Sequence, residues 1–131
     1  MIAGFVADLT AVLHLLDTGD KSGARMALDD IADAGHTLLI PATVFTQALI
    51  IADPTSDRVM WLYGFRACEV ADHTGREAFN VAAQSRFADR PYEVHLHDAQ
   101  TAYLAGARDW PILTADPARW TGYNHLDLVQ L

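Results

Sequence analysis

The sequence is poor in positive charge and in cysteine. It has nine lysine and arginine residues against seventeen aspartate and glutamate residues, and its formal net charge is −8. A broad basic face for gripping nucleic acid is therefore excluded, because phosphate contacts dominate that kind of binding. The single cysteine, Cys68, lies in an apolar run and cannot form an internal disulfide. We expect it to be a buried thiol rather than a nucleophile.

Long apolar runs and several common site motifs are also missing. The segment Leu38–Ala52 is interrupted by Pro41, Thr46 and Gln47, so no stretch reaches the length needed to cross a membrane. The segment Met1–Thr10 has neither a basic region nor a cleavage pattern. A cytoplasmic location is the expectation. Cysteine pairs, a glycine-rich phosphate loop and the HExxH and Gly-x-Ser-x-Gly motifs do not occur.

The length and the apolar content indicate one packed domain. The chain has 131 residues, of which 51% are hydrophobic. This is enough for a single core and too little for two, so we expect one domain over residues 1–131.

Short apolar runs alternate with helical patterns along the chain. Strands are expected at 2–7, 36–41, 67–71, 112–113 and 126–131, with the last at a sheet edge. Helices are expected at 10–16, 22–34, 42–52, 57–65 and 74–87, and from Asp98 to the turn at Asp109–Pro111. This alternation predicts an α/β fold with three layers, α/β/α, around a short parallel sheet.

Two of these helices carry specific expectations. The helix 42–52 is almost wholly apolar, so we expect it to be buried. In the helix that begins at Asp98, small residues recur at the spacing of one face, which predicts a close approach to the sheet. The residues of this face are Ala99, Ala102, Tyr103 and Gly106.

Three aspartates stand at positions where ligands bind in such folds. Asp8 follows the first strand, Asp98 begins a helix, and Asp116 follows a late strand. Each alone could be a helix cap. If all three converge, their mutual repulsion requires cations, and Mg²⁺ prefers such carboxylates together with phosphate oxygens. Two such ions can activate water and stabilise the leaving oxygen in phosphodiester cleavage.

Four segments in order resemble the PIN domain, and within it the toxin nucleases known as VapC. They cover nearly the whole chain: FVADLTAVL, IPATVFTQAL, HDAQTAYLAGA and ILTADP. Each segment is a weak signal alone, and the ordered set is more specific. The resemblance implies a PIN-like fold and a Mg²⁺- or Mn²⁺-dependent endoribonuclease of a type II toxin–antitoxin pair. It also implies an RNA substrate, a homodimer and a small antitoxin partner.

The resemblance also implies roles for single residues. Asp8, Asp98 and Asp116 would hold the metal ion. Thr10 and Thr114 would orient carboxylates or water through their hydroxyl groups. All five are placed among the catalytic residues by this reading.

Gln47 departs from the family pattern, which has a glutamate at this position. Helical spacing places Gln47 with Val44 and Ile51, so we expect it to face inward. An amide keeps a carbonyl oxygen but loses the negative charge, which weakens the expected Mg²⁺ binding and leaves Gln47 a degenerate member of the catalytic set. The alternative function is therefore a catalytically inactive PIN-like binding or regulatory module.

Other sites are less well supported by the sequence. His95, His97 and Asp98 have a spacing that zinc could use, although such spacing arises by chance in an extended segment. A phosphorylated receiver would need a lysine late in the chain, and the only lysine is Lys21. An aspartate-nucleophile phosphatase would need Asp-x-Asp, and here the residue two positions after Asp8 is a threonine.

Arginines and aromatic residues in the middle of the chain have two interpretations each. The arginines belong either to solvated helix faces or to a groove that contacts phosphates. The aromatic residues belong to the core or in part to a subunit or antitoxin interface. The residues concerned are Arg58, Arg66, Arg76, Arg86 and Arg90, and Trp61, Tyr63 and Phe65.

Overall fold

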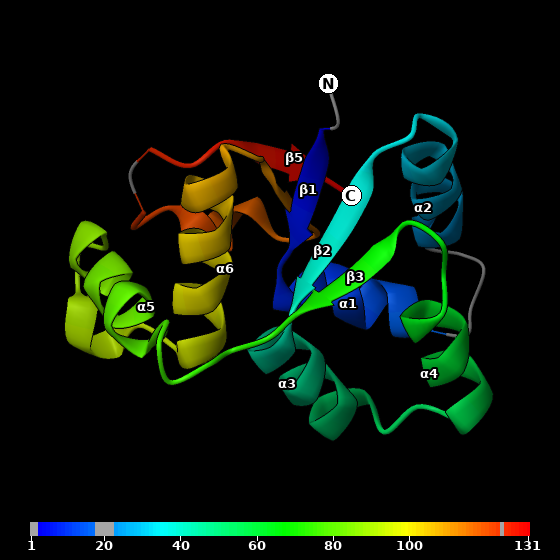
Figure 1. The fold of residues 1–131 in the computed structure, drawn as a ribbon, viewed down its shortest axis with the longest axis horizontal. Helices are drawn as coiled ribbons and strands as arrows, with labels where there is room; N and C mark the ends of the chain where they lie inside the picture. The colour runs from blue at the N-terminus through cyan, green and yellow to red at the C-terminus, as the bar shows by residue number, and fades with distance from the viewer. Residues whose placement is uncertain (1–2, 18–22, 124) are drawn as a thin grey trace.

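A computed structural model of the protein describes residues 3–17, 23–123 and 125–131. Five parallel strands form one sheet in the order β3-β2-β1-β4-β5, so β5 is an edge strand as expected (Figure 1). The strands are β1 (Gly4–Ala7), β2 (Thr37–Pro41), β3 (Cys68–Ala71), β4 (Ile112–Thr114) and β5 (Leu128–Gln130).

Helices cover both faces of this sheet. They are α1 (Leu9–Leu16), α2 (Ala24–Asp33), α3 (Ala42–Ala52), α4 (Ser56–Tyr63), α5 (Ala78–Gln84) and α6 (Leu96–Arg108). Short 3₁₀ turns add η2 (Ser85–Phe87), η3 (Pro91–Glu93) and η4 (Pro117–Trp120). The predicted α/β class with a short parallel sheet is confirmed. No helix in the described ranges is long and apolar enough to cross a membrane.

Alternate residues of the strands supply two separate cores. Val6, Leu39 and Ile112 pack with α6 on one face of the sheet. Their neighbours Leu38 and Leu113 pack on the other face with α1, α2, α3 and α4. Because strand residues point alternately to the two faces, continuous apolar runs are what a sheet buried on both sides requires.

Proline, glycine and aspartate set several of the helix limits. Pro41 precedes α3, which runs over Ala42–Ala52 as predicted and stops at Asp53, whose φ is +42°. Gly35 follows α2 with φ +75°, the left-handed conformation expected for the residue after a helix. The first residue of the helix expected at 22–34 lies outside the described residues, as does the first residue of the strand expected at 2–7.

The prediction that α3 is buried all round is wrong. Val44 and Ala48 are fully buried in the core. Ile50 and Ile51, in contrast, are 68% and 53% exposed near the end of the helix. Apolar composition alone therefore overstates the burial of α3.

Two further details of the helices differ from the prediction. Gly106 in α6 is exposed, and a Cβ added there would meet no atom within 4 Å, so it does not mediate close packing. The buried face of α6 continues instead through Leu104 and Ala105. Helix α5 begins at Ala78 rather than at Thr74 and gives way to η2 after Gln84.

The strand order creates a switch point between β1 and β4. From the central strand β1 the chain passes to β2 and β3 on one side, then returns to place β4 and β5 on the other. Connections that leave two adjacent parallel strands in opposite directions open a crevice at their carboxyl ends. Asp8 follows β1 directly, and Thr114 ends β4.

Candidate functional site

Asp8 is completely buried at the end of β1 and uses both of its carboxylate oxygens. Its Oδ1 accepts hydrogen bonds from the Thr10 hydroxyl at 2.7 Å and the Ala11 backbone N–H at 2.9 Å. Its Oδ2 accepts from the Trp120 indole N–H at 2.9 Å. Asp8 thus caps α1, as one of its two interpretations predicts, and also reaches across the crevice to η4.

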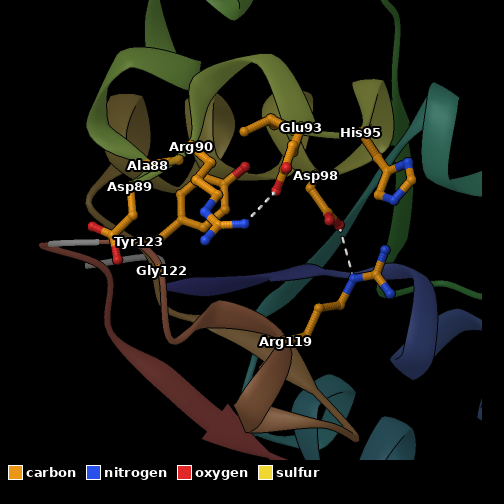
Figure 2. Close-up of a pocket in the computed structure, with 10 residues that line it drawn as sticks. Ala88, Asp89, Arg90, Glu93, His95, Asp98, Arg119, Gly122 and Tyr123 are labelled. Atoms are coloured by element: carbon orange, nitrogen blue, oxygen red, sulfur yellow. Dashed lines mark hydrogen bonds and ion pairs between the residues drawn. The ribbon is translucent and has the colours of Figure 1, made fainter.

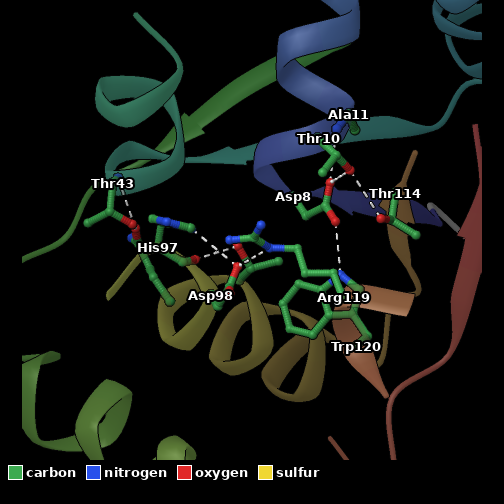
Figure 3. A network of polar contacts seen from close by, with 11 residues as sticks. Asp8, Thr10, Ala11, Thr43, His97, Asp98, Thr114, Arg119 and Trp120 are labelled. Carbon is green, nitrogen blue, oxygen red and sulfur yellow. Dashed lines mark hydrogen bonds and ion pairs between the residues drawn. The ribbon is translucent and has the colours of Figure 1, made fainter. Parts of the chain in front are cut away.

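A hydrogen-bond chain through two threonines ties Asp8 to the end of β4 (Figure 3). The Thr10 and Thr114 hydroxyl oxygens lie 3.2 Å apart. Because the only hydroxyl proton of Thr10 goes to Asp8, Thr114 must donate to Thr10. The Ala115 N–H also donates to Thr10, and the Asp116 N–H donates to Thr114. Both hydroxyls therefore act to fix the position of the Asp8 carboxylate.

Asp98 lies in the first turn of α6 and forms an ion pair with Arg119. Arg119 Nε donates to Asp98 Oδ1 at 3.0 Å, and His97 Nδ1 lies 3.2 Å from the same oxygen. Burial alone would raise the pKa of Asp98. The hydrogen bonds from His97 and Arg119 and the charge of Arg119 outweigh burial, so the net effect lowers the pKa.

The pocket beside Asp98 has a volume of about 450 Å³ (Figure 2). Its lining includes Arg119, Tyr123 and His95. The Tyr123 hydroxyl is buried and has no hydrogen-bond partner among the described residues. Burial first, and then the Asp98 charge, raise the pKa of Tyr123 to about 12. The Tyr123 hydroxyl is thus a buried polar group that senses the Asp98 charge.

Asp116 and Gln47 stand apart from the buried carboxylates. Asp116 is exposed, and its side chain makes no capping hydrogen bond to η4. Gln47 is half-buried rather than packed inward, and it lines a neighbouring pocket of about 640 Å³. His97, which bonds to Asp98, lines that second pocket too.

The residues present fit a divalent ion by type and not by arrangement. Carboxylates are suitable ligands for Mg²⁺. In the described ranges, however, no three His, Cys, Asp or Glu side chains lie close enough to hold one metal ion. Both oxygens of Asp8 already accept hydrogen bonds, and Asp98 is paired with Arg119. The three residues of the zinc alternative lie near one another, since the rings of His95 and His97 stack at 5.3 Å and His97 Nδ1 lies 3.2 Å from Asp98 Oδ1, but they do not form such a group.

Three residues that sequence reasoning missed help to hold this region together. Arg119 and Trp120 bond to the carboxylates, and the segment they come from gives no sign of these partners. Gln100 is completely buried in α6. Its side-chain carbonyl accepts from the backbone N–H and the hydroxyl of Thr43, and its amide donates to the carbonyls of Ala71 and Asp72 at the end of β3.

The arginines in the middle of the chain have structural partners where contacts are seen. Arg58 donates to the carbonyls of Leu15 and Asp17 at the end of α1 and lies over the Trp61 ring at 4.2 Å. Arg66 pairs with Asp33 on the surface. For these two residues the structural interpretation is the better supported one.

The architecture matches a known structure closely. Residues covering 97% of this chain superpose on 98% of a chain in the crystal structure of VapBC2 from Rickettsia felis bound to a DNA fragment from their promoter. The TM-score is 0.71, and the sequences are 13% identical. The likeness establishes the fold, which is PIN-like, as the four resembling segments predict. No family of sequences and no characterised protein matches this chain in sequence.

Proposed function

We propose that the chain is an endoribonuclease of the toxin–antitoxin type, acting on RNA phosphodiester bonds at the carboxyl edge of its sheet. The observation that carries this proposal is a pair of buried carboxylates, Asp8 and Asp98, contributed by opposite ends of the chain at the switch point. Burying ionised groups costs free energy, so groups kept in this state at a ligand-binding edge are candidates for function.

The proposal includes Mg²⁺ or Mn²⁺ as the cofactor, with Asp8, Asp98 and Asp116 as the ligands. Thr10 and Thr114 would hold Asp8 in place through the hydroxyl chain described above. Gln47 would take the fourth position without contributing charge. In the present arrangement the Arg119 guanidinium neutralises Asp98.

The proposed partners are RNA, a second copy of the chain and a small antitoxin, all in the cytoplasm. Exposed apolar side chains on α3 and α4 support a protein interface, because large apolar groups concentrate where subunits meet. They are Ile50, Ile51, Met60 and Tyr63. The VapBC2 complex from Rickettsia felis offers a precedent for an assembly on this fold.

The test is cleavage of a structured RNA by purified protein with Mn²⁺, against the same reaction with EDTA. We expect slow cleavage by the native chain and faster cleavage by Gln47→Glu, which restores the missing charge. Asp98→Asn should abolish cleavage, whereas Asp29→Asn, an equal change at an exposed position on α2, should not. If neither the native protein nor Gln47→Glu exceeds the Asp98→Asn background, the nuclease proposal fails.

The second candidate is a catalytically inactive PIN-like binding or regulatory module. Two observations favour it: the neutral Gln47 and the internal ion pair between Asp98 and Arg119. This candidate predicts that RNA binding, measured by fluorescence anisotropy with a labelled RNA, occurs without cleavage in any variant. Cleavage that depends on Asp98 would exclude it.

A further inference from the structure

A second pocket lies beside the buried carboxylates, at the carboxyl ends of β2 and β3. Its volume is about 640 Å³, which is within the usual range for sites that bind small molecules. Gln47 on α3, His73 after β3 and Leu96 at the start of α6 line it. His97 lines it as well, and its Nδ1 lies 3.2 Å from Asp98 (Figure 3). A group bound in this pocket would therefore lie next to the proposed cleavage site.

One buried side chain, Gln100 of α6, holds the walls of this pocket together. Its carbonyl accepts hydrogen bonds from the N–H and the hydroxyl of Thr43, at the start of α3. Its amide donates to the carbonyls of Ala71 and Asp72, where β3 leads into the next wall. Thr43 and Asp72 both line the pocket. The cavity is therefore formed in advance, and a ligand that enters it does not have to order the surrounding chain.

Two of the lining side chains have hydrogen-bonding groups that the fold leaves unused. His73 Nδ1 is buried and has no partner among the described residues. Gln47 is half-buried, and its amide makes no hydrogen bond to any described residue. Gln100, in contrast, uses both ends of its amide. Because buried polar groups in folded proteins are normally bonded, two unused ones in the same cavity point to a polar ligand.

The pocket offers uncharged donors and acceptors rather than a site for a phosphate. The lining residues that the structure describes include no lysine or arginine, and Asp72 is the one acid among them. An anionic group would therefore be repelled here. The apolar side chain of Leu96, which is 56% exposed, lines the same cavity. A ligand with a neutral polar edge and flat apolar faces matches this lining, and a nucleobase is such a group.

We propose that this pocket binds one unpaired base of the RNA, with Gln47 and His73 bonding to the edge of the base. Proteins read RNA sequence mainly from single-stranded bases, through hydrogen bonds to their exposed edges. A glutamine amide presents a donor and an acceptor side by side and can bond to two adjacent groups of a base. A glutamate would present acceptors only. Gln47 thereby has a use that needs no charge. The inference rests on the proposed function for its choice of RNA as the ligand.

The test is fluorescence anisotropy with short single-stranded RNAs that differ only in one central base. EDTA is present, so that no divalent ion takes part. The proteins are native, Gln47→Leu and Gln84→Leu, and Gln84, the last residue of α5, does not line the pocket. We expect the native protein to prefer one base about fivefold over the weakest, the size of effect that one or two hydrogen bonds provide.

Gln47→Leu should bind the four RNAs equally, whereas Gln84→Leu should keep the native preference. Equal binding of the four RNAs by the native protein, or no binding of any of them, overturns the inference. A native preference that persists in Gln47→Leu overturns it too.

A second measurement uses the native protein and so does not depend on whether a variant folds. NMR would follow the side-chain amide signals of Gln47 and Gln84 and the ring signals of His73 during titration with the preferred base as a free nucleoside. Gln47 and His73 should shift together, with Gln84 unchanged. A missing shift at either pocket residue, or an equal shift at Gln84, contradicts the inference. Tighter binding of the nucleoside than of the RNA would overturn the choice of RNA as the ligand.

The two proposals fail separately. Cleavage of RNA by the native chain without any base preference in binding would leave the nuclease and remove the base pocket. Base-selective binding that depends on Gln47, with no cleavage by any variant, would do the reverse.

Discussion

Asp98 loses hydration when the chain folds and gains hydrogen bonds from Arg119 and His97. Its pKa falls below the ordinary value of 3.8 despite the burial, so the unfolded chain binds a proton to this group more readily than the folded one. The ionised carboxylate therefore stabilises the fold above the unfolded pKa. That contribution disappears as the pH falls through the folded pKa.

A pH series tests this balance. We expect the free energy of unfolding of the native protein, measured with urea, to exceed that of Asp98→Asn at about pH 6 and to approach it near about pH 2. The exposed-site variant Asp29→Asn should follow the native curve throughout. If the difference in unfolding free energy between native and Asp98→Asn does not change with pH, Arg119 and His97 do not stabilise the ionised form of Asp98.

Gln100 is a second residue whose polar groups are fully used inside the fold. Gln100→Leu keeps the size of the side chain but leaves Thr43 and two backbone carbonyls without their partners. We expect a loss of about 2–4 kcal/mol in unfolding free energy, because unsatisfied buried polar groups cost about 1–3 kcal/mol each and part of that cost is relieved by relaxation. Gln84→Leu, at a half-buried position at the end of α5, should change stability by much less.

The sequence predicts site residues that directly end or follow a strand. It does not predict residues whose contacts form only when distant segments pack together. Asp8 and Thr114 come at the ends of β1 and β4, which the apolar runs predict. Arg119 and Gln100 give no such sign, since their partners lie far away along the chain. Only the docking of α6 and η4 against the sheet reveals what they bind.

At the start of β1, the close contact with Trp110 is possible because Gly4 has no side chain. A Cβ on Gly4 would lie 2.6 Å from the Trp110 ring and 2.7 Å from the Thr37 carbonyl oxygen in the adjacent strand. The backbone neighbour cannot move without disturbing the pairing of β1 with β2. Gly4 thus allows Trp110 to cover the start of the central strand.

The two glycines Gly4 and Gly106 should respond to alanine in opposite directions. We expect Gly4→Ala to lower the free energy of unfolding by about 1–3 kcal/mol through overpacking. Gly106→Ala, in open space within α6, should raise it by about 0.5–1 kcal/mol, because alanine is the better helix former. Thermal melting of both variants checks the pair, and a stabilising Gly4→Ala would contradict the packing described for Trp110.

The limits of the elements were more predictable than their exposure. Local residues decide where α3 begins and ends, and Pro41 and Asp53 are visible in the sequence. Its burial depends on which neighbours reach it. Ile50 and Ile51 are as apolar as Val44, yet more than half of each side chain is exposed among the described residues, whereas Val44 is fully buried.

Over the whole molecule, an acidic surface coexists with exposed apolar side chains on α3 and α4. The stacking of Phe45 on Tyr63 at 6.1 Å connects these two helices. The net charge of −8 opposes self-association at low ionic strength, and salt screens that repulsion. A homodimer formed through this face should therefore become tighter as salt is added.

Sedimentation velocity tests the proposed dimer. We expect the native chain to sediment as a dimer and the double variant Ile50→Lys/Met60→Lys as a monomer with an unchanged circular dichroism spectrum. Met26→Lys is the matched control, since Met26 is 71% exposed but lies on α2. A native chain that remains monomeric at high salt would remove the homodimer from the proposal.

The hydrogen bond between Trp120 and Asp8 joins residues 112 positions apart in the sequence. During synthesis, Asp8 is made 112 residues before Trp120, so its Oδ2 has no indole donor until that residue has followed. Contacts of such long range form late in folding because they close large loops. A chain that ends before Trp120 would therefore carry the first strand and its carboxylate without a completed site, so the proposed activity would require Trp120 to have been added.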